Sequence, residues 1–354
     1  MRLVIAGGGT GGHLFPGIAV AEEFLARGKG NEVLFIGTEK GIEARILPRL
    51  GFRLECIAAA GIRGKGVLSR IKGAAMLFVG FVQAWRVISR FCPDRVLGVG
   101  GYASGPVVLA AAGMGIGRAI HEQNAIPGFT NRVLARFVER VFISLTGSER
   151  YFPGGKVILT GNPIRKEILA AMLEGANPPA PSDIPLSKRG TGGDFRILVF
   201  GGSAGAHSIN QAMAAALPFL AGFRDRLVIT HQTGENDLGE VKEAYQREGF
   251  AARVLAFIDN MAEAYGRADL IVCRAGATTV AEVTACGKPC IFIPYPYAVD
   301  DHQRLNAESL LKQGAGFMIL DRELSGEGLA RLIKELMDAP EKIKEAGRNA
   351  KRLA

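Results

Sequence analysis

Three glycine-rich segments carry the residue pattern with the clearest chemistry. They run from Gly7 to Gly12, from Gly98 to Gly105 and from Gly201 to Gly205, and each follows a short apolar run and precedes a helical pattern. Glycine lets a ligand approach the backbone, and the helix N-terminus behind it offers free N–H groups and partial positive charge to an anion. One such loop is weak evidence, but three in equivalent positions favour the binding of phosphate groups.

The segment Asp269–Glu282, DLIVCRAGATTVAE, is more specific. An apolar strand pattern ends at Cys273, and a helix is expected to begin near Ala277. The backbone N–H groups of Ala277 to Thr279, together with two threonine hydroxyls, suit a diphosphate. Two roles fit Glu282 equally well. Its carboxylate accepts hydrogen bonds from the two vicinal hydroxyls of a ribose, or it only complements the helix dipole.

Two of the glycine loops also match motifs of other enzyme classes. The first satisfies GxGxxG, the dinucleotide fingerprint, but Glu39 comes too late for the acidic residue expected at the end of the second strand. The segment Gly201–Gly205 satisfies GxSxG, the nucleophile elbow, but no local pattern nominates a histidine partner. An oxidoreductase and a serine hydrolase are therefore disfavoured, and Ser203 is interpreted as a hydroxyl that donates to a phosphate.

Alternating strand and helix patterns place these loops in two similar halves, separated by the Pro- and Gly-rich segment Glu174–Asp194. Several strand patterns are apolar on both faces, as in parallel sheets covered by helices. We therefore expect two doubly wound α/β domains whose ligands bind beyond the carboxyl ends of the strands, in a cleft between the domains. The expected strands are 3–6, 33–36, 54–58, 95–99, 119–121, 141–144, 157–159, 197–200, 227–229, 254–257, 270–273 and 290–293.

Composition narrows the class of protein. The 354 residues suffice for about two domains. Five cysteines without a CxxC pair predict neither a disulfide framework nor a zinc site. The net charge of +9 lies in residues 1–163, which hold 20 basic and 10 acidic residues against 23 and 24 in residues 164–354. A basic half favours polyanionic partners, but no aromatic residues interleave with the basic ones, so nucleic acid is not expected.

One region indicates contact with a membrane surface. The longest apolar run, Ala74–Val82, is far shorter than the roughly 20 residues that span a bilayer, and the N-terminus does not read as a secretory signal. Residues 64–86 nevertheless combine basic and apolar side chains in a helical pattern, which is typical of a helix lying on an anionic membrane. The residues predicted to contact the membrane are Lys65, Arg70, Lys72, Leu77, Phe78, Phe81 and Trp85.

Eight motifs follow one another along the chain, namely GGGTGGHLFPG, GGYASGP, HEQNAIPGFTNR, GNPIR, GGSAGA, FIDNM, CRAGATTVAE and DDHQRLNA. Together they resemble the MurG family of bacterial cell-wall synthesis, within glycosyltransferase family 28, over nearly the whole chain. The resemblance implies a GT-B fold, with two Rossmann-like doubly wound domains facing a cleft. It implies an acceptor- and membrane-binding domain over 1–163 and a UDP-GlcNAc-binding domain over 164–340, with 341–354 packing back on the first.

The resemblance also implies a reaction. It is the inverting transfer of N-acetylglucosamine (GlcNAc) from UDP-GlcNAc to the 4-hydroxyl of MurNAc in undecaprenyl-pyrophosphoryl-MurNAc-pentapeptide (lipid I), which gives lipid II for peptidoglycan synthesis. The implied partners are UDP-GlcNAc, lipid I, the anionic inner-leaflet surface and other cell-wall synthesis proteins, and the implied location is peripheral, on the cytoplasmic face of the inner membrane. A different glycolipid glycosyltransferase, a UDP-GlcNAc 2-epimerase and a non-catalytic nucleotide-sugar sensor remain alternatives.

The resemblance assigns substrate-binding roles motif by motif. The residues that it implies are Thr10, Gly11 and Gly12 for the sugar and phosphates, Asn124 for GlcNAc, Arg165 and Ser203 for the diphosphate, Ile258 for uracil through its backbone, Ala277, Thr278, Thr279, Val280, Ala281 and Glu282 for the phosphates and ribose, and Gln303 for GlcNAc. Spacing in the last motif varies within the family, so His302 is the alternative to Gln303.

Transfer of this kind needs a general base for the acceptor hydroxyl. His13 is the first candidate, because histidine exchanges a proton most readily near neutral pH. Glu122 is the alternative, with Asn131 as the residue that would orient it. We expect no cofactor and no metal, because helix N–H groups and Arg165 can stabilise the departing UDP, and the acidic pair Asp300–Asp301 reads as loop structure.

Overall fold

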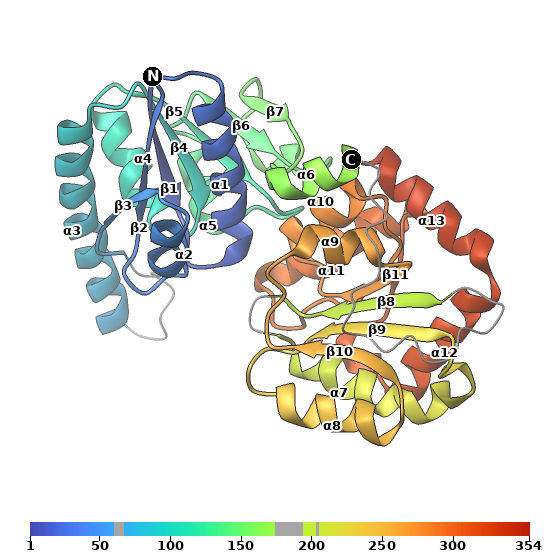
Figure 1. Ribbon diagram of the computed structural model, residues 1–354. Helices are drawn as coiled ribbons and strands as arrows, with labels where there is room; N and C mark the ends of the chain where they lie inside the picture. Colours follow the sequence, from blue (N-terminus) through green and yellow to red (C-terminus); the bar gives the residue numbers. More distant parts are fainter. Residues whose placement is uncertain (60–66, 174–193, 203–204) are drawn as a thin grey trace. The chain divides into compact units, whose positions relative to one another are not determined.

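The computed structural model describes residues 1–59, 67–173, 194–202 and 205–354, with the backbone alone for 67–74 and 171–173. The chain divides into two compact units, Met1–Lys166 and Glu167–Ala354, each with its own sheet and core (Figure 1). The domain boundary expected from the sequence, after residue 163, lies three residues before this division.

The first unit is built on a seven-stranded parallel sheet with the strand order β3-β2-β1-β4-β5-β6-β7. Its elements are β1 (Arg2–Gly7), α1 (Gly11–Ala26), β2 (Glu32–Gly37), α2 (Glu43–Arg49), β3 (Arg53–Cys56), α3 (Val67–Phe91), β4 (Arg95–Gly100), α4 (Ser104–Gly113), β5 (Gly117–Glu122), α5 (Phe129–Leu134), β6 (Arg140–Ile143), η1 (Glu149–Tyr151) and β7 (Val157–Leu159), and α6 (Lys166–Leu173) begins at its end.

Alternating side chains of the central strands fill two separate cores, one on each face of this sheet. In β1, Leu3 and Ile5 pack with the apolar faces of α1 and α2. Val4 and Ala6 point to the other face and pack with α3, α4 and α5. Because successive strand residues point to opposite faces, a strand buried on both sides must be apolar throughout. This explains the continuous apolar runs in the sequence.

The second unit has a six-stranded parallel sheet with the strand order β10-β9-β8-β11-β12-β13. Its elements are β8 (Phe195–Phe200), α7 (His207–Ala216), η2 (Leu217–Phe223), β9 (Leu227–Gln232), α8 (Leu238–Arg247), β10 (Ala251–Leu255), α9 (Met261–Arg267), β11 (Leu270–Cys273), α10 (Ala277–Ala285), β12 (Cys290–Phe292), η3 (Val299–Asp301), α11 (His302–Leu311), β13 (Phe317–Met318), η4 (Asp321–Glu323), α12 (Gly326–Asp338) and α13 (Pro340–Arg352). Its largest core lies between the sheet and α7, α8 and α12.

The C-terminal helix α13 packs on α10 of the second unit. Its Ala346 and Ala350 are buried, and the Lys351 ammonium donates to the Ala285 carbonyl oxygen over 2.9 Å. The predicted return of residues 341–354 to the first unit stays a prediction.

The first two glycine loops of the sequence pack against each other, backbone to backbone. A Cβ atom on Gly7 would overlap the carbonyl oxygen of Gly100, and one on Gly101 would overlap that of Gly8. Gly9 differs, because its φ is +87° and a Cβ there would meet nothing within 4 Å. Packing between the two loops therefore requires glycine at Gly7 and Gly101, whereas at Gly9 only the left-handed φ favours glycine.

This packing predicts a large difference between two glycine substitutions. Gly101 and Gly115 have φ angles of +80° and +70°, but only Gly101 has a backbone atom in the way of a Cβ. Gly115→Ala should lower the free energy of unfolding by about 1–2 kcal/mol, the cost of the left-handed backbone. Gly101→Ala should lower the free energy of unfolding by about 1–3 kcal/mol more than this, because of the overlap. Equal denaturant midpoints for the two variants would contradict this account.

Candidate functional site

A buried carboxylate anchors the first glycine loop. Glu43, the first residue of α2, is fully buried and accepts hydrogen bonds from the Gly9 N–H at 2.7 Å and from the Thr38 N–H and hydroxyl, both at 2.9 Å. Cβ atoms on Gly8 or Gly41 would overlap this carboxyl group, and one on Gly37 would overlap the Cγ of the same side chain. Glu43 was not singled out from the sequence, and the available signal was the two glycines in GTEKGIEA, a segment that holds both Glu39 and Glu43.

Removal of Glu43 should destabilise the first unit. Glu43→Ala leaves two N–H groups and one hydroxyl without their acceptor, so we expect the free energy of unfolding to fall by about 2–4 kcal/mol. Glu39→Ala removes an exposed carboxylate from the same connection and should stay within about 0.5 kcal/mol of the wild type. Chemical denaturation followed by circular dichroism measures both, and matching curves for the two variants would refute the anchor.

His13 lies in the first turn of α1, behind the glycine loop and against the second one. A Cβ on Gly100 would come within 2.6 Å of its Nδ1, and Nδ1 is 3.2 Å from the Gln123 side-chain oxygen. Thr10, exposed and extended, precedes the helix, and Gly11 and Gly12 begin it. The structure thus brings Thr10, Gly11, Gly12 and His13 together at the end of β1.

Glu122, at the end of β5, is buried and fully engaged. Its carboxylate accepts hydrogen bonds from the Asn124 N–H at 3.0 Å, the Asn124 side-chain amide at 3.3 Å, the Gly128 N–H at 3.2 Å and the Asn131 side-chain amide at 2.8 Å. The expected contact between Asn131 and Glu122 is therefore present. These donors make Glu122 the support of the loop that carries Asn124.

Arg165 belongs to the first unit, and its guanidinium carbon lies 5.0 Å from the centre of the Phe15 ring of α1. Ser203, its expected companion at the diphosphate, lies outside the described residues. The loop around Ser203 is partly described: the Gln232 side-chain amide donates to the Gly202 carbonyl oxygen over 2.7 Å.

The N-terminus of α10 has the form expected for binding an anion. Gly276 is its N-cap without a side-chain capping bond, and the helix begins at Ala277 with no acidic residue in its first turn. The first backbone N–H groups of a helix have no acceptor within it. The first described intrahelical bond joins the Val280 N–H to the Gly276 carbonyl oxygen at 2.9 Å. The N–H groups of Ala277, Thr278 and Thr279 precede it.

Glu282 follows on the next turn of α10 and is nearly fully buried, together with Val280. The Tyr265 hydroxyl of α9 donates to its carboxylate over 3.0 Å. Tyr265 was not predicted, and it orients the carboxylate expected to bind the ribose. Ala281 is partly exposed beside it.

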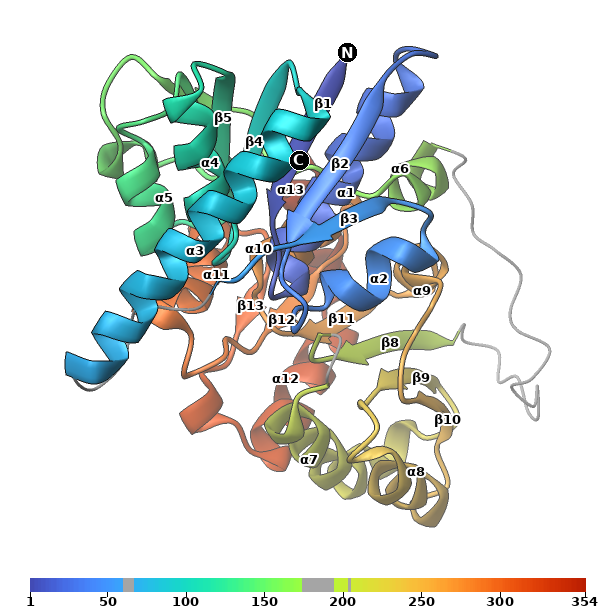
Figure 2. The ribbon, with the colours of Figure 1, turned by 90° about the vertical axis from the view of Figure 1, so that its left-hand side faces the viewer.

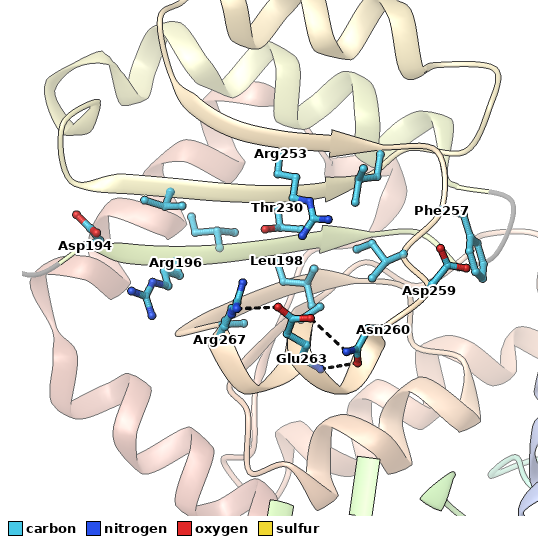
Figure 3. A pocket seen from close by; sticks show the side chains of 16 residues that line it. Asp194, Arg196, Leu198, Thr230, Arg253, Phe257, Asp259, Asn260, Glu263 and Arg267 are labelled. Carbon is cyan, nitrogen blue, oxygen red and sulfur yellow. Dashed lines mark hydrogen bonds and ion pairs between the residues drawn. The ribbon is translucent and has the colours of Figure 1, made fainter. Parts of the chain in front are cut away.

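Ile258 follows β10, and its N–H donates to the Gln232 side-chain oxygen over 2.8 Å. Of the Ile258 backbone groups expected to bind uracil, the N–H is already held by Gln232, and the uracil contact stays a prediction. Among the predicted site residues that the structure describes, Ile258 alone lines the cavity of about 270 Å³ in Figure 3. This cavity lies between β8, β9 and β10 on one side and α9 on the other.

The loop before α11 holds Gln303 and His302 in different ways. The Gln303 side-chain oxygen accepts from the Tyr295 N–H at 3.0 Å. The His302 Nδ1 lies 2.7 Å from the Val299 carbonyl oxygen. Asp300 and Asp301 both adopt left-handed φ angles, 53° and 54°, which are uncommon for residues other than glycine. The acidic pair thus forms the turn into α11, as expected.

A buried arginine joins the loops around these residues. The Arg274 guanidinium donates to the carbonyl oxygens of Ile293 and Pro294, to the Asp321 carboxylate at 2.6 Å and to the Ser208 hydroxyl at 2.8 Å. One side chain therefore fixes the segments after β11 and β12 to α7 and η4. The sequence did not reveal this role, because its partners are far apart along the chain.

The described residues contain no cluster of three or more His, Cys, Asp or Glu side chains that could hold a metal ion. The five cysteines are free thiols. The expected independence of metal and cofactor stays a prediction.

The predicted membrane residues that the structure describes lie on α3. The inward face of this helix contributes Ala84, Val87, Ile88 and Phe91 to the core. On the outward face Phe78 is 70% exposed and Trp85 38%. Leu77 and Phe81 are partly buried, and the rings of Phe81 and Trp85 lie 5.8 Å apart.

Figure 2 shows the N-terminal turns of α3, which include Arg70 and Lys72, projecting beyond the first sheet. Lys65 lies outside the described residues. Among the helices that the structure describes, none is long and apolar enough to cross a membrane.

Two family models match the chain in the order of its two units. Residues 3–143 match the glycosyltransferase family 28 N-terminal domain, and residues 196–354 match the glycosyltransferase family 28 C-terminal domain. The chain belongs to glycosyltransferase family 28. Over its whole length it is 64% identical to a UDP-N-acetylglucosamine–N-acetylmuramyl-(pentapeptide) pyrophosphoryl-undecaprenol N-acetylglucosamine transferase from Geotalea uraniireducens. The match covers 94% of that relative. It is 63% identical, again over its whole length and 94% of the relative, to the transferase of the same name from Geobacter sulfurreducens.

Two solved structures share the fold of this chain, and the more similar one also supports the family. The crystal structure of Acinetobacter baumannii MurG is 33% identical, covers 99% of this chain and 94% of its own, and superimposes with a TM-score of 0.74. A UDP-N-acetylglucosamine 2-epimerase from Listeria monocytogenes, at 12% identity and a TM-score of 0.64, covers 100% of this chain and 92% of its own and shares the fold. The GT-B fold and the family expected from the sequence are confirmed.

Proposed function

We propose that this chain transfers GlcNAc from UDP-GlcNAc to the 4-hydroxyl of MurNAc in lipid I, with inversion at the anomeric carbon, and so forms lipid II. The observation that carries the proposal is full-length identity of 64% to a transferase with this donor and acceptor in its name. The arrangement of His13 in the first unit and of the α10 N-terminus in the second supports it.

The second unit binds the donor. The N–H groups at the start of α10 face the diphosphate, where the helix dipole favours negative charge. Glu282, oriented by Tyr265, accepts hydrogen bonds from the ribose hydroxyls. Gln303, or His302 in its place, contacts GlcNAc. Ser203 adds a donor for the diphosphate, and Arg165 adds another from the first unit.

The first unit supplies the base. The acceptor oxygen attacks the anomeric carbon, the bond from that carbon to the β-phosphate oxygen breaks, and the acceptor proton passes to His13. Glu122 is the weaker candidate, because four N–H groups already occupy its carboxylate. UDP leaves as an anion stabilised by N–H donors and Arg165, so the reaction uses no metal and no cofactor.

The outward face of α3 holds the enzyme on the anionic cytoplasmic face of the inner membrane, where lipid I and other cell-wall synthesis proteins are met. Phe78 and Trp85 insert at the headgroup level. The surplus of basic residues in 1–163, among them Lys65, Arg70 and Lys72, adds attraction to anionic lipid.

Phe78→Ser should weaken binding to vesicles that contain anionic lipid by about tenfold, since the apolar burial of one large side chain is lost. Phe219→Ser provides the matched control, because Phe219 is a 47% exposed phenylalanine of the second unit, outside the basic half. Flotation with and without anionic lipid measures both. Equal flotation of Phe78→Ser and the wild type would remove α3 from the membrane contact.

Release of UDP from UDP-GlcNAc with a short-chain lipid I analogue tests the proposed function, with UDP-GalNAc as the donor control. Release that requires the acceptor and UDP-GlcNAc supports it. Tight binding of UDP-GlcNAc without acceptor-dependent release would reject the transferase and leave the epimerase or the nucleotide-sugar sensor.

A further inference from the structure

His13 begins a hydrogen-bonded chain that runs into the core of the first unit. Its Nδ1 contacts the Gln123 side-chain oxygen at 3.2 Å, the Gln123 nitrogen contacts the His121 Nδ1 at 3.2 Å, and the His121 Nε2 contacts the Gly161 carbonyl oxygen at 3.2 Å. Gln123 and His121 are almost fully buried, at 1% and 4% exposure. Neither was predicted as a site residue.

The orientation of the Gln123 amide is determined by a backbone group. Its nitrogen lies 2.8 Å from the Val99 carbonyl oxygen, and a carbonyl oxygen only accepts. The two N–H bonds of this amide therefore go to Val99 and to the His121 Nδ1. The Gln123 oxygen is left facing His13, where it can only accept.

His121 fits this direction of donation. Burial lowers the pKa of His121 to about 4, so the ring is neutral at physiological pH and carries one proton. Its Nδ1 accepts from Gln123, so that proton is on Nε2, where the Gly161 carbonyl accepts it. The Ser144 hydroxyl, 3.3 Å from the same Nε2, donates to the Glu122 carbonyl oxygen over 3.0 Å.

We infer that Gln123 is a positioning residue that keeps a proton on the Nδ1 of His13 and so leaves Nε2 as the atom that takes the acceptor proton. An acceptor at Nδ1 stabilises the N–H there whether His13 is neutral or charged, so proton exchange is confined to Nε2. Within the described part of the chain, His13 Nε2 has no hydrogen-bond partner. The role as base rests on the proposed function, but the position of the proton does not.

The proton positions are measurable in the wild-type protein without substrate. Two-bond ¹H–¹⁵N correlation spectra of ¹⁵N-histidine-labelled protein distinguish a bare from a protonated ring nitrogen, and single substitutions assign the five histidines. At the high-pH plateau of the titration, where the ring is neutral, His13 should show a protonated Nδ1 and a bare Nε2. His121 should show the reverse. A His13 ring protonated on Nε2, or a mixture of both forms, would overturn the inference.

Gln123→Met tests the consequence for turnover. Methionine has a similar length but offers no acceptor to Nδ1, so the Nδ1–H form should lose its dominance in the same spectrum. We expect kcat to fall about 10- to 100-fold, as when a histidine loses the partner that sets its tautomer, with the Kd for UDP-GlcNAc within twofold of the wild type. A merely structural role would change the Kd and Tm and leave the ratio of the two ring forms unaltered.

Gln211→Met is the matched control. Gln211 lies on α7 of the second unit and donates to Glu240 over 2.9 Å, away from the histidine chain, so neither the spectrum of His13 nor kcat should change. If Gln123→Met does not fold, the wild-type spectrum alone decides. The protein could show the predicted proton positions but no acceptor-dependent release of UDP. That result would reject the proposed function and retain the inference about the His13 ring.

Discussion

His13→Ala should lower kcat by about 100- to 10,000-fold, the range that one general base contributes. The acceptor hydroxyl then loses its proton to water, while the residues that hold UDP in the second unit are untouched. We expect the Kd for UDP-GlcNAc, measured by calorimetry on the same preparation, to change less than twofold. Turnover near the wild-type level would exclude His13 as the base.

Glu122→Gln separates the two candidate bases. The amide keeps one acceptor oxygen in the place of the carboxylate but puts an NH₂ group among the four N–H donors that now surround it. We therefore expect a lower Tm together with a smaller loss of kcat than in His13→Ala. The opposite order of the two kcat values would assign the base to Glu122.

Glu282→Gln should weaken UDP binding by about 10- to 100-fold, because hydrogen bonds to a charged group contribute about 1.5–3 kcal/mol. The carboxylate is buried and already oriented by Tyr265, so its bonds to ribose hydroxyls form at little entropic cost. At saturating UDP-GlcNAc, kcat should change far less than the donor KM.

A comparison of UDP with 2′-deoxy-UDP makes this prediction specific. Loss of the 2′-hydroxyl should weaken binding to the wild type and have little effect on Glu282→Gln, because hydroxyl and carboxylate contribute one shared interaction. An equal loss in both proteins would place the ribose elsewhere. Glu282 would then only complement the dipole of α10.

The strands were predictable because most are apolar on both faces. β1 was expected at 3–6 and β8 at 197–200, and both lie within the observed strands. β10 was expected at 254–257 but runs from Ala251 to Leu255. It is an edge strand, all its residues are only half-buried, and it begins with two alanines, so its start gave no pattern. β13 was missed, because Phe317 and Met318 are too short a run.

The residues that hold the site in place could not be predicted in the same way. The spacing of Glu282 in its helix was visible in one segment of sequence. Glu43 is a partner of Gly9 across 34 residues, and Gln123 a partner of His13 across 110. No local pattern contains both members of such a pair. The first two glycine loops were located correctly, but Gly7 and Gly101 proved to be required by the opposite loop as well as by their own turn.

The two interlocked glycine loops also bear on drug resistance. Resistance to an inhibitor that binds side chains arises when those side chains are substituted at little cost to the stability of the fold. The backbone around Gly7, Gly8, Gly100 and Gly101 offers no such escape, because a methyl group on Gly7 or Gly101 overlaps the facing loop and one on Gly8 or Gly100 collides with Glu43 or His13. A compound that hydrogen-bonds to peptide groups of these loops would therefore bind a surface that tolerates almost no substitution at these four glycines.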